Sequence, residues 1–141
     1  MPKQPPREIF ELPAYAKRRI LVVDDNRDAA LSLALLLKHN GDDTATAHDG
    51  LEALEAAEHF RPDVILLDIG MPKLNGYEVC RRIREQPWAK NVLIIAVSGW
   101  DQTRDRQQSQ ESGFDDHMVK PVDFSALIAV LADRQQEPER Q

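Results

Sequence analysis

The sequence predicts an α/β fold with a single, doubly wound, five-stranded parallel sheet. Short apolar runs alternate with helical patterns five times along the chain, as expected when helices connect parallel strands and cover both faces of their sheet. The chain has 141 residues, of which 42% are hydrophobic and 30% charged, and this is typical of one globular domain. We therefore expect one domain over residues 18–132, between a flexible Pro-rich arm (1–17) and a polar tail (133–141).

Charge and cysteine content exclude several classes of function. The chain has 24 acidic and 18 basic residues and a formal net charge of −6, which argues against nonspecific binding of nucleic acid through Lys and Arg. Its only cysteine, Cys80, rules out a disulfide within the chain. No apolar run reaches the length of a membrane span, and the first residues lack the apolar core of a signal peptide. We expect a cytoplasmic protein with neither a nucleic-acid nor a membrane partner.

The elements follow in order from local patterns. Short apolar segments predict strands over 20–23, 44–47, 64–67, 92–97 and 116–119. Helical patterns predict helices over 29–39, 49–58, 76–85, 102–112 and 123–131. Asp49 with Glu52 predicts a capping box, and Asp123 predicts the cap of the last helix. The helix over 102–112 contains no apolar side chain, so we expect it to be marginal or mobile.

Helical periodicity also predicts which side chains face the core. Leu31 and Leu35 widen the apolar stripe of the helix over 29–39, and Leu51 faces inward in the next helix. In the helix over 76–85, the apolar residues form the buried face and Arg84 lies on the solvated face with Arg81 and Arg82.

Polar side chains follow four of the predicted strands at their carboxyl ends. Asp24 and Asp25 follow the first strand, Asp68 the third, Ser98 the fourth and Lys120 the fifth. Each one alone is explained equally well as a helix cap, a turn residue or part of a loop. In a parallel sheet, however, these ends meet at the edge where ligands bind. Their convergence therefore predicts a functional site.

Phosphoryl transfer is a chemistry that uses three carboxylates, a hydroxyl and an ammonium together. Carboxylates repel one another, so a cation is implied, and Mg²⁺ accepts one or two carboxylates beside water and phosphate oxygens. An ionised Asp68 is able to attack phosphorus. The metal, Ser98 and Lys120 would then neutralise charge on the phosphoryl oxygens. The residues thus predict phosphoryl transfer onto Asp68.

Over about residues 18–132, the sequence resembles the receiver domains of two-component response regulators. The resemblance rests on four motifs, which are Leu21-Val22-Val23-Asp24-Asp25-Asn26, Leu67-Asp68-Ile69-Gly70-Met71-Pro72 with Asn75-Gly76, Val97-Ser98-Gly99, and Val119-Lys120-Pro121. It implies a flavodoxin-like receiver fold with strand order 2-1-3-4-5, the order of the family's chemotaxis member. It also implies a signalling switch and not an enzyme.

The resemblance implies a role for each residue. Asp68 would accept a phosphoryl group from a phosphohistidine on a sensor histidine kinase or a histidine phosphotransfer protein. Asp24, Asp25, Asp68 and the backbone carbonyl of Gly70 would hold Mg²⁺. The peptide bond between Lys120 and Pro121 would be cis.

The remaining roles concern the switch. Ser98 and Lys120 would contact the phosphoryl oxygens. Ser98 would move inward on phosphorylation, and the side chain at position 117 would follow it. This movement would reshape the face formed by 102–112, the last strand and the last helix, and a downstream protein partner would read the change.

Two positions depart from the family pattern. His117 stands where Tyr or Phe is usual, and both an inward-packing switch residue and a surface histidine without a special role are open interpretations. Gly70 and Trp100 stand two residues beyond Asp68 and Ser98, at positions that tune phosphoryl lifetime in the family. Neither side chain acts as an acid or a base, so we expect slow self-dephosphorylation with Trp100 shielding the site.

Other classes of protein fit the sequence less well. A flavodoxin-like FMN carrier would need a Ser/Thr/Gly-rich phosphate loop after the first strand, where this chain is acidic. A phosphatase with an aspartyl-phosphate intermediate would need an acid two residues beyond its nucleophile, where Gly70 stands. Within the receiver family, the sequence leaves open a free-standing regulator or a receiver excised from a hybrid histidine kinase or phosphorelay intermediate. It also leaves open a monomer or a weak dimer.

Overall fold

The computed structural model describes residues 18–71, 75–99 and 111–135. Their elements are β1 (Arg19–Val23), α1 (Arg27–His39), β2 (Asp43–Ala47), α2 (Gly50–Phe60), β3 (Val64–Asp68), α3 (Gly76–Arg84), the 3-10 helix η2 (Pro87–Ala89), β4 (Leu93–Ser98), β5 (Asp116–Val119) and α5 (Phe124–Gln135). The predicted arm over 1–17 and most of the predicted helix over 102–112 lie outside the described residues. The tail was predicted to begin at 133, but α5 continues to Gln135.

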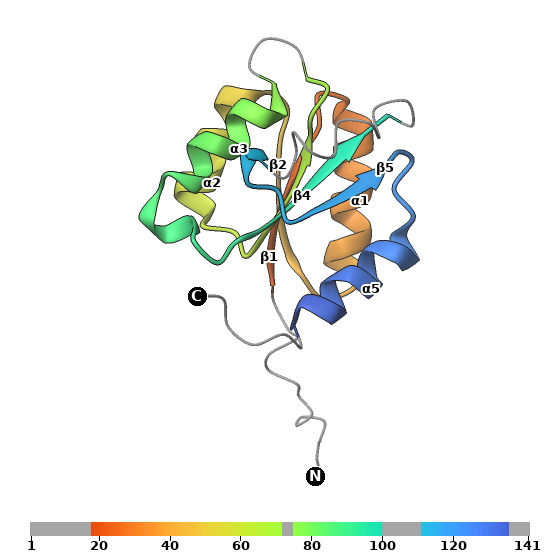
Figure 1. Ribbon diagram of the computed structural model, residues 1–141. Helices are drawn as coiled ribbons and strands as arrows, with labels where there is room; N and C mark the ends of the chain where they lie inside the picture. The colour runs from red at the N-terminus through yellow and green to blue at the C-terminus, as the bar shows by residue number, and fades with distance from the viewer. Residues whose placement is uncertain (1–17, 72–74, 100–110, 136–141) are drawn as a thin grey trace.

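The five strands form one parallel sheet in the order β2-β1-β3-β4-β5, as predicted (Figure 1). Every residue of β3 and β4 is buried, because central strands of a parallel sheet are covered on both faces and therefore read as continuous apolar runs. The residues of β5 and most residues of β2 are only partly buried, as expected at the two edges. The register places Asp68, at the end of β3, opposite Val97 of β4.

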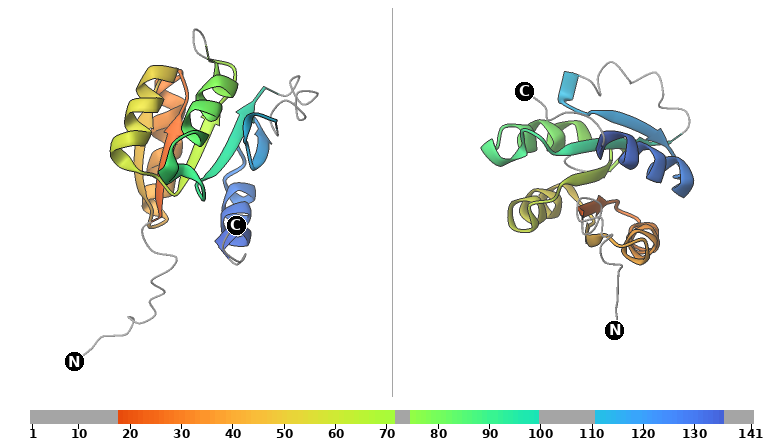
Figure 2. Two further views of the ribbon diagram at one scale, coloured as in Figure 1. Left: turned by 60° about the vertical axis from the view of Figure 1, so that its left-hand side comes forward. Right: turned by 90° about the horizontal axis from the view of Figure 1, so that it is seen from below.

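Helices cover both faces of the sheet (Figure 2). One face carries α2 and α3, and the other carries α1 and α5. Successive side chains of a strand point to opposite faces, so Ile65 and Leu67 of β3 join the core under α2 and α3. Val64 and Leu66 join the core under α1 and α5. The strand ends are thus held between two packed layers.

The prediction that three leucines face inward is wrong. Leu31 and Leu35 of α1 are 54% and 57% exposed, and Leu51 of α2 is 69% exposed. The buried side chains of α2 and most of those of α1 are alanines, for example Ala34 and Ala57. The buried stripe of each helix is thus narrower than the apolar pattern indicates. Leucines outside that stripe remain on the surface.

The predicted helix caps are confirmed. The Asp49 carboxylate accepts the backbone N–H of Glu52 at 2.8 Å, and the Glu52 carboxylate accepts the N–H of His48 at 2.7 Å, which is a complete capping box. The Asp123 carboxylate accepts the N–H of Ser125 at 3.0 Å. These bonds satisfy amides that have no partner within the helix.

Arg84 was predicted on the solvated face of α3 but is mostly buried. Its guanidinium donates to the carbonyls of Ala89, Val92 and Gly113 and lies 2.6 Å from the Asp115 carboxylate. A guanidinium has five donors in a fixed plane and bonds several acceptors at once. Arg84 therefore ties α3 to the segments that flank β4 and β5.

Candidate phosphoryl-transfer site

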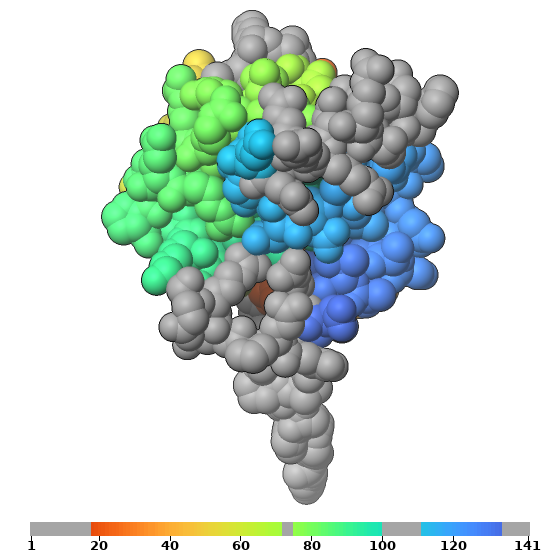
Figure 3. Space-filling model, in the orientation of Figure 1, coloured from red at the N-terminus to blue at the C-terminus, as the bar shows by residue number. Residues whose placement is uncertain are grey.

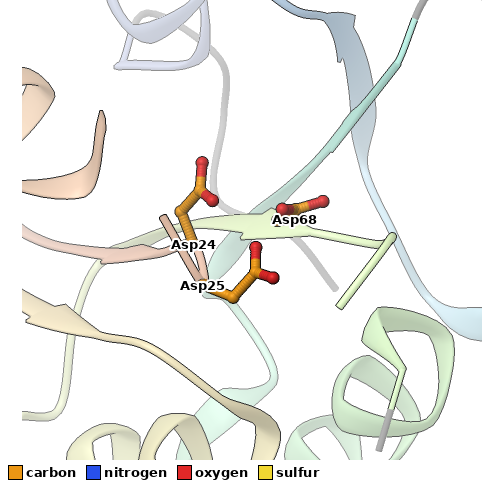
Figure 4. Close-up of side chains that lie close together, drawn as sticks. All are labelled: Asp24, Asp25 and Asp68. Atoms are coloured by element: carbon orange, nitrogen blue, oxygen red, sulfur yellow. The ribbon is translucent and has the colours of Figure 1, made fainter. Parts of the chain in front are cut away.

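The polar residues at the strand ends meet at the carboxyl edge of the sheet. Asp24 and Asp25 directly follow β1, and Asp68 is the last residue of β3. Each carboxylate offers an oxygen, and these oxygens all lie within 4.8 Å of one another (Figure 4). The Asp24-Asp25 pair and Asp68, which are about 45 residues apart along the chain, thus form one acidic cluster at the edge where ligands bind.

One ammonium group partly compensates this cluster. Asp68 and Asp24 are only 5% and 9% exposed, and buried charges need partners. Nζ of Lys120 lies 2.9 Å from Oδ2 of Asp68 and 3.3 Å from Oδ2 of Asp24. Burial lowers the pKa of Lys120, but the hydrogen bond to Asp68 and the charges of Asp68 and Asp24 outweigh it, so the pKa is raised overall. Lys120 therefore stays charged at neutral pH.

Backbone amides hold the two buried carboxylates in place. The N–H of Gly70 donates to Oδ1 of Asp68 at 2.9 Å, and the N–H of Asn26 donates to Oδ1 of Asp24 at 2.9 Å. Each aspartate thus bonds the backbone two residues ahead, as in an Asx turn. In both carboxylates, Oδ2 is the oxygen next to Lys120. The orientation of the acids is fixed before any ligand arrives.

A glycine allows the segment after Asp68 to close against α3. A Cβ on Gly76 would lie 2.6 Å from Cα of Ile69 and 2.8 Å from the carbonyl oxygen of Asp68. Such contacts are with backbone and cannot relax by a side-chain rotation. Gly76 of the sequence motif thus lets the start of α3 pack directly against the backbone of Asp68 and Ile69.

The acidic cluster suits a hard divalent cation. Three carboxylates against one ammonium leave an excess of negative charge, and their oxygens are the ligands that Mg²⁺ prefers. Gly70, whose carbonyl was expected as a further ligand, is exposed two residues beyond Asp68. The donor set of these residues therefore fits the predicted metal.

Ser98 and His117 are in contact. Ser98 ends β4 and is completely buried, and its Oγ lies 2.6 Å from Nε2 of His117 on β5. This contact favours the interpretation of His117 as an inward-facing residue. The backbone N–H of Lys120 also donates to the carbonyl of Ser98 at 2.8 Å. The peptide bond between Lys120 and Pro121 is cis, which confirms that prediction.

An apolar groove opens beside the acidic cluster. It has a volume of about 510 Å³ and is bordered by Asp24 and Lys120 on the site side. Its apolar walls come from α1 and from the segment after β5, and they include Leu33, Leu36, Pro121 and Val122. The site is therefore open toward one face of α1.

The family model of the response regulator receiver domain matches residues 20–132. The chain belongs to this family. Among curated proteins, this receiver domain is 40% identical over 111 residues to the response regulator MprA of Mycobacterium ulcerans, covering 79% of this chain and 47% of MprA. It is 40% identical over 118 residues to the DNA-binding response regulator MtrA of Mycobacterium leprae, covering 84% of this chain and 51% of MtrA. The chain spans about half the length of these relatives.

Solved structures agree with this assignment. The chemotaxis response regulator CheY4 of Vibrio cholerae matches with a TM-score of 0.78 and 28% identity, over 84% of this chain and 99% of that one. The receiver domain of the sensor histidine kinase PA1611 from Pseudomonas aeruginosa matches with a TM-score of 0.77 and 31% identity, over 86% and 100% of the two chains. That structure holds a magnesium ion in its active-site cleft.

The comparisons bear on two expectations for this receiver domain. Because MtrA is a DNA-binding regulator, the expectation that this protein has no nucleic-acid partner has no support. Within the described residues, no helix is long and apolar enough to cross a membrane. Trp100, the expected shield of the site, lies outside the described residues.

Sequence reasoning missed one residue at this edge of the receiver domain. Nδ1 of His48 lies 3.1 Å from the carbonyl oxygen of Asp24. This ring nitrogen carries a proton, because a carbonyl oxygen only accepts. His48 directly follows β2. The search for polar residues at the carboxyl ends of the strands would have found it if the second strand had been included.

Proposed function

We propose that this receiver domain accepts a phosphoryl group on Asp68 from the phosphohistidine of a sensor histidine kinase or histidine phosphotransfer protein, with Mg²⁺. The observation that carries the proposal is the placement of a buried Asp68 carboxylate 2.9 Å from the Lys120 ammonium, with the Asp24 and Asp25 carboxylates within 4.8 Å. Each transfer modifies Asp68 of the domain itself, so the domain acts as a switch and not as an enzyme.

The reaction follows from the residues at the site. A carboxylate oxygen of Asp68 attacks phosphorus in line, and the new P–O bond forms as the P–N bond to the donor imidazole breaks. The leaving nitrogen keeps the electron pair of the broken bond, and the ring departs as neutral imidazole when its other nitrogen carries a proton. Lys120 and the Ser98 hydroxyl contact phosphoryl oxygens and stabilise their charge in the transition state. The amide of Gly70 keeps the acceptor carboxylate oriented.

Mg²⁺ would be held by Asp24, Asp25, Asp68 and the Gly70 carbonyl. When bound, it supplies positive charge that offsets the repulsion between the carboxylates and the incoming phosphoryl group. The magnesium ion in the active-site cleft of the PA1611 receiver supports this assignment. The excess of acid over base at the cluster supports it independently.

The surface around the groove fits a protein donor. A phosphohistidine reaches Asp68 only if its protein covers the carboxyl edge of the sheet. Beside that edge, the apolar groove is bordered by Asp24 and Lys120 and is lined by Leu36 of α1, which is 50% exposed. Exposed apolar grooves are typical of protein interaction sites. We therefore assign the phosphodonor to this face of α1.

The output is a change at β5 and α5 that a downstream partner reads. Ser98 and His117 link the acceptor site to β5, which lies between α3 and α5 on the face seen in Figure 3. The curated relatives are response regulators, and this favours a regulator over a receiver excised from a hybrid kinase. We place the exchange in the cytoplasm, because Cys80 is a free thiol and free thiols are typical of reducing compartments.

Intact-mass measurement tests the proposal. The protein is incubated with Mg²⁺ and acetyl phosphate, beside Asp68→Asn and a matched control, Asp63→Asn, which removes an acid at the opposite end of β3. We expect one phosphoryl adduct on the wild type and on Asp63→Asn, and none on Asp68→Asn or in EDTA. An adduct that persists in Asp68→Asn would refute the assignment of the acceptor. The decay of the adduct in the wild type and in Trp100→Glu tests the expected slow self-dephosphorylation.

A further inference from the structure

The contact between Ser98 and His117 is shorter than most hydrogen bonds between an oxygen and a nitrogen atom. Oγ of Ser98 and Nε2 of His117 are 2.6 Å apart. The strands β4 and β5 lie side by side (Figure 1). Their register pairs His117 with Ala96 and Val119 with Ser98, so the side chains of Ser98 and His117 are diagonal neighbours on one face of the sheet. The hydroxyl that is assigned to the phosphoryl group is thus already engaged by a side chain of β5.

Two arrangements of protons are compatible with this contact. If Nε2 is bare, the Ser98 hydroxyl donates its only proton to the ring, and no proton remains for a phosphoryl oxygen. If Nε2 carries a proton, the ring donates to Oγ, and the hydroxyl proton is free to point elsewhere. Only the second arrangement lets Ser98 donate to a phosphoryl group and keep its contact with His117.

The backbone on both sides holds the ring within reach of Ser98. The Asp116 carboxylate accepts the backbone N–H of His117 at 2.9 Å. The N–H of Lys120 donates to the carbonyl of Ser98 at 2.8 Å. The strand carrying the imidazole and the strand carrying the hydroxyl are therefore fixed relative to each other beside this contact.

We propose that His117 is a positioning residue for the phosphoryl site: its Nε2–H donates to Ser98 Oγ and so directs the Ser98 hydroxyl proton toward a phosphoryl oxygen on Asp68. The inference rests on the proposed function of Asp68 as acceptor. A phosphoryl group on Asp68 favours the form of His117 in which Nε2 carries the proton. Phosphorylation therefore determines where the proton lies on the His117 ring, which belongs to β5. A Phe side chain at this position would offer no such bond.

The first test reads the proton on the ring. The full chain is labelled with ¹⁵N-histidine, and its ring nitrogens are observed with Mg²⁺ and beryllium fluoride, a mimic of the acyl phosphate. The His117 signals are assigned by their loss in His117→Gln, and the exposed His39 serves as reference. We expect Nε2 of His117 to be protonated in the beryllium fluoride state. A bare Nε2 in that state would overturn the proposal.

The second test is a mutant cycle on the rate of adduct formation from acetyl phosphate. His117→Gln places an amide N–H where Nε2 lies, whereas His117→Asn has the same chemistry with a shorter reach. We expect His117→Asn to be roughly five- to tenfold slower than the wild type, as for the loss of one hydrogen bond, and His117→Gln to stay within about twofold. In a Ser98→Ala background, His117→Asn should have no further effect.

The outcomes separate this inference from the proposed function. No adduct on the wild type would count against Asp68 as acceptor and would remove the basis of the inference. A normal adduct on the wild type, with equal rates for His117→Gln and His117→Asn, would overturn the role of His117 alone. The same holds if His117→Asn slows Ser98→Ala as much as it slows the wild type, because the effect would then not pass through the hydroxyl.

Discussion

Asp25 offers a direct test of the repulsion within the acidic cluster. Its carboxylate lies within 4.8 Å of those of Asp24 and Asp68, but it is exposed. The ion pairs found for Lys120 go to Asp24 and Asp68. Asp25→Asn should therefore remove repulsion and leave those ion pairs intact. We expect the variant to be more stable than the wild type when no metal is present.

The distance sets the size of the effect. Two unit charges at most 4.8 Å apart repel by at least about 0.9 kcal/mol in water and by roughly four times that at an effective dielectric constant of about 20. Asp25 makes two such contacts, and its exposure argues for the value in water. We therefore expect a gain of about 1–2 kcal/mol in the free energy of unfolding, and a smaller gain at high salt.

Urea unfolding followed by circular dichroism measures this gain. The wild type, Asp25→Asn and the control Glu55→Gln, which removes an exposed acid from α2, are compared at low salt in EDTA and in Mg²⁺. Mg²⁺ should stabilise the wild type by about 2.7 kcal/mol at a concentration of 100 times its Kd, and Asp25→Asn by less. If Asp25→Asn is no more stable than the wild type in EDTA, repulsion within the cluster is not a significant cost.

Three further predictions concern Arg84, Cys80 and the α1 surface. Arg84→Ala leaves the Asp115 carboxylate and three carbonyls without this partner and should cost about 2–4 kcal/mol in urea unfolding, with a smaller loss for Arg84→Lys. Burial raises the pKa of Cys80 to about 12. Between about pH 8.5 and pH 12 only the unfolded chain ionises this thiol, so stability should fall with rising pH, and the slope should be smaller in Cys80→Ala. Leu36 lines the groove and is 50% exposed. Leu36→Ser should therefore slow phosphotransfer from a phosphorylated histidine phosphotransfer protein by at least about threefold but leave the rate from acetyl phosphate unchanged; equal slowing with both donors would contradict donor docking on α1.

The strands and the acidic edge could be predicted because each carries a local signal. A run such as Val64–Leu67 predicts a buried strand, and the polar residue at its end is placed by the general rule for parallel sheets. The contacts of Arg84 carry no such signal, because its partner Asp115 is 31 residues away in sequence. The exposure of Leu35 was mispredicted for a related reason: helical periodicity indicates which side of a helix faces the core, but the width of the buried stripe depends on which elements pack beside the helix in the fold.

The link between the acceptor site and β5 depends on which bonds can change. At the site edge, backbone bonds such as Ile69 N–H to the Val97 carbonyl and Lys120 N–H to the Ser98 carbonyl join neighbouring strands. Loss of such bonds would be costly, because buried amides and carbonyls need partners. The Lys120 ammonium and the Ser98 hydroxyl proton, in contrast, can turn toward a phosphoryl group without breaking a backbone bond between strands. A phosphoryl group on Asp68 is therefore expected to act on β5 through these side chains, and His117 is the β5 side chain in contact with the Ser98 hydroxyl.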